Sequence, residues 1–399
     1  MKTKLLIIAF VFSFGLSAQN IWTKKADYPG AARHAAVSFV IGNKAYVGTG
    51  TDDFIFFKNF WEYDAGTDVW SAKATFPGVA RREAVAFSVG TDGFVGTGCC
   101  GGMSDFWKYN SLTDSWSAIA PYPGGPTMTG IAFSIGGKGY VGLGDDGGAL
   151  FSKKIFEYDP VTNIWTPKAN FPGAGRVDAL GFSMNGKGYV AIGDDGGAAF
   201  LKDLWEYDPI TDTWIQKLDF PGGPRATAAG FAIASTGKLY IGTGDDNIAQ
   251  YSDFWEWNSA SNTWIQVLDF GGGIRTDESG FAIGNKGYVV LGQIGAPPEF
   301  NDLWEYSPAV GINELKNETA ILISPNPCSF ETVLQTNIDL KNATLEVYNS
   351  LGQQVKIINN ISGQKIIFHR DNLLSGIYFI RLTQEDNTFM MSKLVISDN

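Results

Sequence analysis

The sequence is poor in the residues that most often build catalytic and metal centres. Among its 399 residues are two histidines and three cysteines, His34, His369, Cys99, Cys100 and Cys328. Three cysteines do not make a disulfide framework, and the adjacent Cys99 and Cys100 leave open either a strained vicinal disulfide or two thiols. With only two histidines, a histidine-rich metal centre is not expected. A serine triad is not expected either, because the sequence also lacks a Gly-x-Ser-x-Gly motif.

Positive charge and long apolar runs are scarce as well. The chain has 30 lysines and arginines against 41 aspartates and glutamates, a net charge of −11, which disfavours nucleic acid as a partner. Its longest mainly apolar stretch, Leu5 to Leu16, is too short to cross a bilayer as a helix. Because this stretch follows Lys2 and Lys4 and is followed by Ser17-Ala18, we interpret residues 1–18 as a secretory signal peptide. An exported protein without a transmembrane helix is therefore expected.

One pattern recurs along most of the chain: a tryptophan, a Pro-Gly turn, an arginine and then a Tyr-Val-Gly-like run. The tryptophans recur every 46 to 50 residues, at Trp22, Trp70, Trp116, Trp165, Trp214 and Trp264. An aromatic residue keeps step with them, at Tyr46, Phe94, Tyr140, Tyr189, Tyr240 and Tyr288. A period of this size is typical of an array of identical supersecondary units.

Each repeat divides into four short strands. In the repeat that follows Arg176, strands are predicted at 180–184, 188–192, 204–207 and 213–215. The dipeptide Asn185-Gly186 is a strong hairpin signal between the first two strands, because both residues accept a positive φ. Four antiparallel strands per repeat make one blade of a β-propeller.

The two ends of the array complement each other. The array opens at residues 21–24 with a fourth strand that has no first three, and it closes at residues 303–306 with a third strand that has no fourth. The N-terminal strand is therefore predicted to complete the last blade, which removes two open sheet edges. The expected fold is an all-β, six-bladed propeller closed by its own N-terminal strand.

The repeats resemble those of kelch-type propellers, which include the central domain of galactose oxidase-like proteins. The resemblance rests on runs such as Tyr46-Val47-Gly48 and Tyr140-Val141-Gly142, on the third-strand Trp-Glu-Tyr-Asp and on the Thr-Asp-x-Trp entry to the fourth strand, over residues 21–306. Kelch repeats usually carry a Gly-Gly pair after the second strand, whereas this chain has Gly-Thr-Gly, Gly-Leu-Gly or Ala-Ile-Gly. The resemblance implies the fold. It does not imply copper-dependent galactose oxidase activity, because that chemistry uses histidine ligands and the propeller has only His34.

A second domain is expected after Tyr306, where the repeat stops. Four markers follow in order: Ser324-Pro325-Asn326-Pro327, Leu345 to Gly352, Gly376 to Leu382 and Lys393 to Ile396. Together they resemble the C-terminal sorting domain of type IX secretion in certain Gram-negative bacteria. Alternating strands between Asn-Ser-Leu-Gly and Ser-Gly turns predict a small immunoglobulin-like β-sandwich. The resemblance implies recognition by the type IX machinery and a secreted or outer-surface location.

These patterns divide the chain into four segments. They are a signal peptide at 1–18, a propeller at 19–308, a linker at 309–317 and a sorting domain at 318–399.

Antiparallel strands place two sets of loops on one face of the ring. The loops before each first strand carry a Pro-Gly-x-x-Arg-like motif in five blades, with Arg33, Arg81, Arg176, Arg225 and Arg275, and with Thr127 in the third blade. The loops between second and third strands carry Gly-Asp-Asp-Gly-like segments, in which Cys99-Cys100 replaces the acidic pair of the second blade. The five arginines are candidate ligand contacts. A residue repeated in nearly every blade also suits a structural role, however, such as an ion pair that holds the blades together.

Two residues after the arginine position, carboxylates alternate with uncharged residues around the ring. The six residues are Ala35, Glu83, Thr129, Asp178, Thr227 and Asp277. A spacing of two predicts that each carboxylate stands on the same strand face as its arginine. Because the first strand of a blade is the innermost, Glu83, Asp178 and Asp277 are predicted to form a threefold set near the channel mouth. The alternative is local pairing of each carboxylate with an arginine of an adjacent blade.

Two classes of function remain open. The preferred one is a secreted or surface-displayed propeller that binds a glycan, peptide or protein on the arginine-bearing face, without a cofactor or a metal. Calcium binding by the Asp-Asp-Gly loops is disfavoured, because these loops lack the ligand spacing of an EF-type loop. The other class is a metal-independent carbohydrate-modifying enzyme, by fold analogy with six-bladed kelch proteins that resemble sialic acid mutarotase. There Glu83, Asp178 or Asp277 would act as general acid or base beside an arginine.

Overall fold

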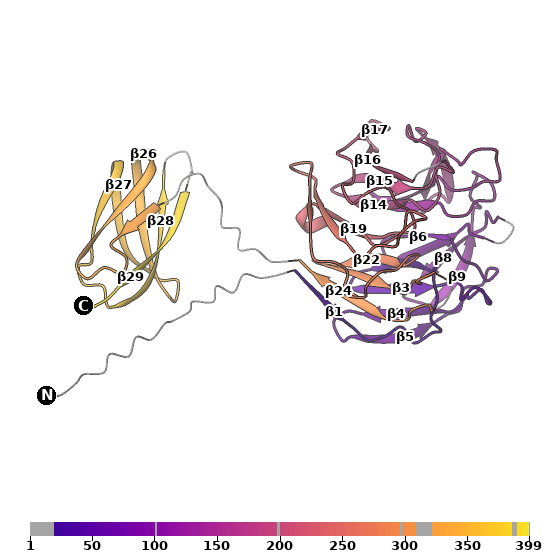
Figure 1. The fold of residues 1–399 in the computed structure, drawn as a ribbon, viewed down its shortest axis with the longest axis horizontal. Coiled ribbons are helices and arrows are strands. Elements are labelled where there is room, and N and C mark those ends of the chain that lie inside the picture. The colour runs from indigo at the N-terminus through magenta and orange to yellow at the C-terminus, as the bar shows by residue number, and fades with distance from the viewer. Residues whose placement is uncertain are drawn as a thin grey trace. The chain divides into compact units, whose positions relative to one another are not determined.

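The structure, a computed structural model, describes residues 20–99, 102–197, 200–295, 298–308, 321–384 and 389–398. The predicted signal peptide, Cys100 and the predicted linker at 309–317 lie outside these residues. The chain divides into two compact units, Met1–Ala309 and Val310–Asn399 (Figure 1).

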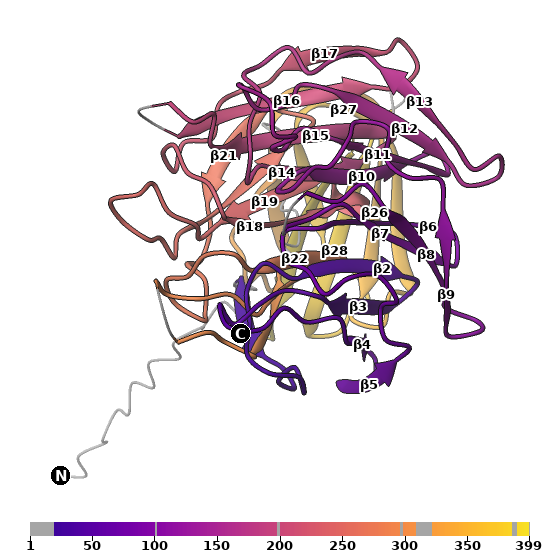
Figure 2. The same ribbon diagram turned by 90° about the vertical axis from the view of Figure 1, so that its right-hand side faces the viewer.

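The first unit consists of antiparallel sheets of four strands each, arranged as the blades of a propeller (Figure 2). Blades one and two are β2 (Val37–Ile41), β3 (Lys44–Gly48), β4 (Phe60–Asp64), β5 (Val69–Lys73), and β6 (Val85–Val89), β7 (Asp92–Gly96), β8 (Phe106–Asn110), β9 (Ser115–Ile119). Blades three and four are β10 (Ile131–Ile135), β11 (Lys138–Gly142), β12 (Ile155–Asp159), β13 (Ile164–Lys168), and β14 (Leu180–Met184), β15 (Lys187–Gly193), β16 (Leu201–Asp208), β17 (Thr213–Gln216). Blade five is β18 (Ala229–Ile233), β19 (Lys238–Gly242), β20 (Phe254–Asn258) and β21 (Thr263–Gln266).

Helical structure is nearly absent from the described part of the chain. A single 3-10 turn, η1 (Ala234–Thr236), follows β18. Across the described ranges, the structure contains no helix with the length and apolar character needed to pass through a bilayer.

The sixth blade combines both ends of the unit. It consists of β22 (Ser279–Ile283), β23 (Lys286–Val290), β24 (Leu303–Ser307) and β1 (Ile21–Lys24), in the order β1-β24-β23-β22. Ile21 pairs with Ser307 and Lys24 with Trp304, which confirms the predicted six blades and the closure of the ring by the N-terminal strand.

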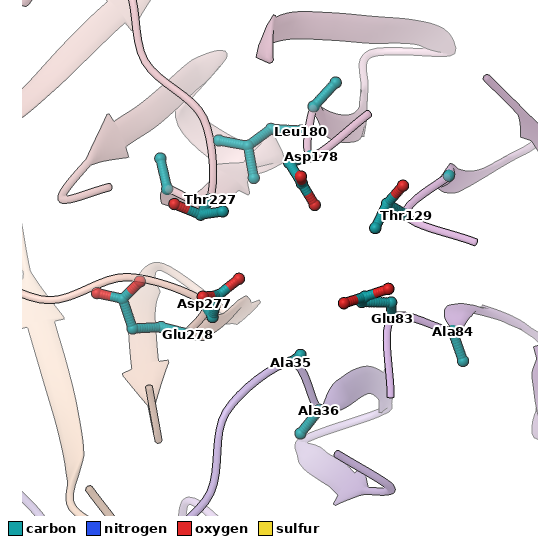
Figure 3. Close-up of a pocket in the computed structure, with 13 residues that line it drawn as sticks. Ala35, Ala36, Glu83, Ala84, Thr129, Asp178, Leu180, Thr227, Asp277 and Glu278 are labelled. Carbon is teal, nitrogen blue, oxygen red and sulfur yellow. The ribbon is translucent and has the colours of Figure 1, made fainter. Parts of the chain in front are cut away.

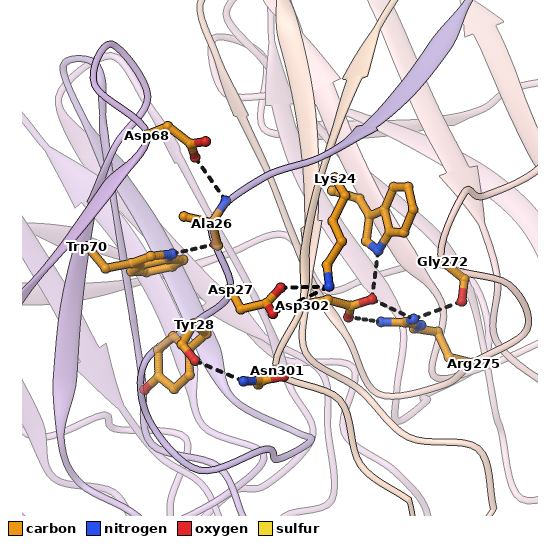
Figure 4. Close-up of polar contacts among 11 residues, drawn as sticks. Lys24, Ala26, Asp27, Tyr28, Asp68, Trp70, Gly272, Arg275, Asn301 and Asp302 are labelled. Atoms are coloured by element: carbon orange, nitrogen blue, oxygen red, sulfur yellow. Dashed lines mark hydrogen bonds and ion pairs between the residues drawn. The ribbon is translucent and has the colours of Figure 1, made fainter.

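The segment after β1 fastens this closure to both neighbouring blades. The Tyr28 amide donates to the Asn301 carbonyl of blade six at 2.7 Å, and the Asn301 side chain donates back to Tyr28 at 3.3 Å. On the other side, Ala26 donates to Asp68 at 3.0 Å and accepts from the Trp70 indole of blade one at 2.8 Å (Figure 4). The junction between the ends of the ring is therefore bonded like the junctions between other blades.

The repeated tryptophan links each blade to the linker that arrives from the previous one. Its indole N–H donates to a backbone carbonyl there at 2.8–3.2 Å, in the pairs Trp70–Ala26, Trp116–Ala74, Trp165–Ala120, Trp214–Ala169, Trp264–Leu218 and Trp22–Leu268. The ring packs edge-on against the aromatic residue of the same linker, as Trp116 does on Phe76 with centroids 5.2 Å apart. Such a pair contributes roughly 0.5–1.5 kcal/mol beyond area burial. The period of the sequence is therefore the period of the contacts between blades.

The second unit is one sheet around its own core. Its strands are β25 (Ile321–Ser324), β26 (Glu331–Asn349), β27 (Gln354–His369), β28 (Gly376–Thr383) and β29 (Phe389–Ile396). The long strand β26 pairs with β25 at one end and with β28 at the other, and its pairing with β27 shifts register several times. Because bulges bend a strand, the expected all-β unit folds over a core that includes Leu334, Val347 and Ile380 as one continuous sheet rather than as two separate ones.

Candidate functional site

The mouth of the central channel is formed by the six residues that follow the arginine positions by two. They are Ala35, Glu83, Thr129, Asp178, Thr227 and Asp277, and all have a left-handed backbone with φ between 51° and 59°. Backbone hydrogen bonds of 2.9–3.3 Å join neighbours in this ring: Ala35 to Asp277, Glu83 to Ala35, Thr129 to Glu83, Asp178 to Thr129 and Asp277 to Thr227, with the donor named first. The ring therefore fixes the direction of each side chain at the mouth.

The left-handed backbone corrects one expectation from the sequence. The innermost strands begin only after the ring, at Val37, Val85, Ile131, Leu180, Ala229 and Ser279. Strand alternation therefore does not apply at the ring, and the prediction that each carboxylate stands on the same strand face as its arginine is wrong. The positive φ instead separates the two side chains: the arginine enters its blade, and the carboxylate faces the channel.

Glu83, Asp178 and Asp277 line one cavity of about 150 Å³. In Figure 3 their carboxylates point inward from three sides, with Thr129 and Thr227 between them. Pockets that enclose a whole small-molecule ligand usually measure roughly 300–1,000 Å³. The cavity therefore suits one functional group of a ligand rather than an entire sugar chain or peptide.

The pKa values of the three carboxyl groups show that the cavity is unfavourable for their ionised forms. Burial, followed by the charges of Asp277 and Glu83, raises the pKa of Asp178 well above its ordinary value. Burial raises the pKa of Glu83 as well, although Arg82 Nε lies 3.0 Å from Glu83 Oε1 and opposes the shift. Burial also raises the pKa of Asp277, against the hydrogen bond from the Gln293 amide at 3.0 Å. Lost hydration and like-charge repulsion both disfavour the ionised carboxylates. A cation placed among them would offset this electrostatic penalty.

The five candidate arginines lie inside the blades and not in the cavity. Their side chains are 0–1% exposed in Arg33, Arg81, Arg176, Arg225 and Arg275. Four of them form ion pairs of 2.5–2.7 Å within their own blade, Arg81–Asp105, Arg176–Asp203, Arg225–Asp253 and Arg275–Asp302, while Arg33 donates to Asn59 at 2.8 Å. Each guanidinium also covers an aromatic ring, as Arg176 covers Phe171 at 4.8 Å. This burial argues for the structural role, and against direct contact with a ligand.

The third blade replaces both members of this pair. Thr127 occupies the arginine position, and Lys154 stands where the other blades have aspartate or asparagine. Lys154 Nζ instead lies 2.9 Å from Asp146. The departure at Thr127 is therefore a compensated change of the ion pair. The aspartates themselves were missed by the sequence analysis, although the pattern Asp-(Phe or Leu)-Trp marks them in each of the four blades.

The acidic loops lie on the same face as the arginine-bearing loops. Val177, next to Arg176, exchanges two backbone hydrogen bonds with Asp194 at 2.9 and 3.0 Å. The Asp194 carboxylate turns back onto its own loop and accepts from the Gly196 amide at 2.7 Å. Cys99 takes the corresponding place in blade two, bridged to Arg82. These loops therefore support the mouth from outside.

A buried carboxyl group beside the cavity was not anticipated from the sequence. Glu278 stands where the other blades have Ala36, Ala84, Gly130, Ala179 and Ala228. Both of its oxygens are shielded from solvent without a hydrogen-bond partner, and the Thr243 hydroxyl lies near without completing one. Burial raises the pKa of Glu278 to about 8, against the opposing charge of Arg275. In Figure 3 its carboxyl group points away from the centre of the cavity.

Comparisons with known proteins bear on both units. Residues 322–397 match the family described as "Secretion system C-terminal sorting domain". A solved structure titled "Structure of YjhT" is similar to 70% of this chain and 96% of its own, with a TM-score of 0.59 and 18% identity. No curated protein matches the chain. At this identity the structural likeness supports the fold alone.

The fold and the family match together define a class of protein. It is an all-β protein with propeller-like blades and a type IX secretion sorting domain at its C-terminal end. The sorting domain indicates engagement of the secretion machinery, and export to the cell surface or the medium.

Proposed function

We propose that this protein is a secreted or surface-displayed binding protein of the kelch type, and that it recognises its ligand at the acidic cavity of the channel mouth. The ligand contributes a cationic group, such as a lysine or arginine side chain or the amine of an amino sugar. The proposal is carried by the convergence of Glu83, Asp178 and Asp277 from alternate blades in one cavity. In this proposal, a signal peptide at residues 1–18 precedes the propeller at residues 19–308, and the sorting domain comprises residues 318–399.

The energetics of the cavity support a cation. Hydrogen bonds between a cation and a carboxylate are roughly twice as strong as neutral ones, and three acceptors surround the same small volume. Removing one partner of a buried hydrogen-bonded charge pair at an interface costs about 2–5 kcal/mol. One cationic side chain seated here would therefore act as an anchor for a larger ligand.

The surface around the cavity supports a polypeptide as that larger ligand. Loops between second and third strands, on the cavity face, carry exposed apolar tips at Phe54 (85% exposed), Leu150 (85%) and Ile248 (94%). Exposed apolar side chains offer surface that a protein partner can bury. A glycan without apolar groups makes less use of them.

The same geometry disfavours a carboxylated sugar, and with it the mutarotase-type alternative. That alternative needs an arginine beside the acid-base residue, whereas the five candidate arginines are buried in the blades. Arg82 lies at the mouth but is paired with Glu83 at 3.0 Å. An anionic substrate in this cavity would face three carboxylates, so the binding protein is the better interpretation.

Neutralising the cavity is expected to abolish binding of basic ligands. The triple variant Glu83→Gln/Asp178→Asn/Asp277→Asn keeps the shape of the ring and removes its charge. Because each hydrogen bond to a charged group contributes about 1.5–3 kcal/mol, we expect the affinity to fall more than ~100-fold. Peptide and glycan arrays with the mature chain identify the ligand, and calorimetric titration measures the change.

A matched control removes the same charge from the rim. Asp27, Asp219 and Asp269 directly precede the aromatic residue in three linkers between blades and do not line the cavity, so the triple Asp→Asn variant there is expected to keep the affinity. Equal binding by the cavity variant and the native protein would contradict the proposed site. Accelerated anomer exchange of a sialic acid, followed by NMR, would favour the enzyme instead.

A further inference from the structure

A second cluster of polar groups lies where the closed ring brings blades one and six together. It consists of His34 in the loop before β2, Asp53 in the loop between β3 and β4, and Glu299 in the loop between β23 and β24. One imidazole nitrogen and one oxygen from each carboxylate lie within 4.8 Å of one another. The cluster contains the one histidine of the propeller unit.

The side chains of this cluster do not complete one another's hydrogen bonds. His34 is 3% exposed, and its Nδ1 is buried without a hydrogen-bond partner. Oε1 of Glu299 is likewise buried without a partner. His34 Nε2 lies 3.4 Å from Asp53 Oδ1, which is longer than a good hydrogen bond. Two ligands bound tetrahedrally to one metal at about 2.1 Å stand roughly 3.4 Å apart. The separation therefore fits two ligands of a shared cation better than a direct bond.

Backbone pairing holds the three residues in place. His34 exchanges two hydrogen bonds with Thr51 at 2.9 and 3.1 Å, and the Thr51 hydroxyl accepts from the Asp53 amide at 3.0 Å. Glu299 is bridged to Gln293, whose side-chain amide donates to Asp277. Ligands positioned by such contacts lose little freedom when a metal binds.

We propose that His34, Asp53 and Glu299 form a binding site for a divalent transition-metal ion, with zinc as the best match. One imidazole nitrogen and two carboxylate oxygens are a ligand set of zinc, and three protein ligands leave the fourth position open to water or to a ligand of the propeller. Calcium fits less well, because it takes six to eight oxygen ligands. The site uses none of the three cavity carboxylates as a ligand, although Gln293 connects Glu299 to Asp277, and it does not rest on the binding function proposed above.

Zinc titration of the mature chain, stripped of metal with a chelator, tests the site. We expect one zinc ion per chain by equilibrium dialysis, and a loss of affinity of at least tenfold in His34→Ala. The matched control is His369→Ala, which removes the other histidine of the chain, an exposed residue of the second unit. Zinc binding that is absent from the native chain, or lost in His369→Ala and kept in His34→Ala, would overturn the proposal.

Further variants separate the metal site from a simple ion pair and from the cavity. Glu299→Gln keeps the size of its side chain, so it is expected to fold normally and to bind zinc at least tenfold more weakly. Cobalt bound in place of zinc is expected to show the visible absorption of a tetrahedral site in the native chain and to lose it in Asp53→Asn. The triple cavity variant is expected to retain the zinc ion. If it lost the ion while His34→Ala retained it, the metal would belong to the cavity, and the assignment would be wrong.

Discussion

Replacing Arg176 by alanine is expected to lower the free energy of unfolding by about 3–5 kcal/mol, the usual cost of breaking a buried ion pair by removing one partner. The guanidinium is fully buried, pairs with Asp203 at 2.5 Å and donates to the Ile192 carbonyl at 2.9 Å. Burial alone would raise the pKa of Asp203, but the hydrogen bonds and charge of Arg176 hold it below its ordinary value. Chemical denaturation of the variant and the native chain measures the loss.

Blade three supplies the matched control for this experiment. The double variant Arg176→Thr/Asp203→Lys copies the residues that blade three has at these positions. The lysine placed at 203 has Asp195 available, as Lys154 has Asp146. Most of the lost stability should therefore return. The deficit of Arg176→Ala should also shrink at acid pH, because Asp203 is then protonated in the folded and unfolded chain alike. An equal deficit in the single and double variants would contradict the pairing argument.

Replacing Glu278 by glutamine is expected to stabilise the protein by about 3 kcal/mol at pH 7 and by less in acid, since one pKa unit is worth ~1.4 kcal/mol. The pKa of this carboxyl is about 8 in the folded chain, against an ordinary value of 4.5. The folded chain therefore binds the proton more tightly, and the stability of the native protein falls as the pH rises from about 4.5 through 8. Glutamine has no such titration, so the two stabilities should diverge across that window.

Thermal melts from pH 4 to pH 9 measure this divergence in stability between the native protein and the variant. Arg275 and Thr243 favour the charged form and Asp277 disfavours it, and all three are unchanged in the variant. Glu278→Ala installs the residue that four other blades use, so it should reproduce the gain. A difference in stability between native and variant protein that is constant with pH would show that folding does not raise the pKa of Glu278.

The fold could be predicted from the sequence because its contacts between blades repeat. Each tryptophan, such as Trp116, packs against the linker that arrives from the previous blade. The same contact therefore requires the same residues in every blade, and the structural repeat is visible as a repeat in the sequence. The closure was visible because residues 21–24 and 303–306 are complementary parts of one unit. The continuous sheet of the second unit was not visible, since it depends on register shifts between β26 and β27 that leave no regular pattern.

The candidate site was predictable in composition but not in geometry. Alternation along the ring pointed to Glu83, Asp178 and Asp277. The left-handed backbone that turns them inward could not be predicted, because threonine rarely adopts a positive φ. Thr129 and Thr227 are held in this conformation by backbone hydrogen bonds between blades. The cluster of His34 and Glu299 could not be predicted from the sequence. These residues are 265 positions apart, and only the closed ring makes them neighbours.

The direction of β24 decides on which side of the propeller the two ends of the ring lie. The loop between β23 and β24 belongs to the cavity face, so β24 runs away from that face and ends at Ser307, where it pairs with Ile21. Ser307, the last residue of β24, therefore lies on the side of the propeller opposite to the cavity. Ile21, the partner of Ser307 in the closing pair, lies on that side too, so neither end of the ring obstructs the cavity.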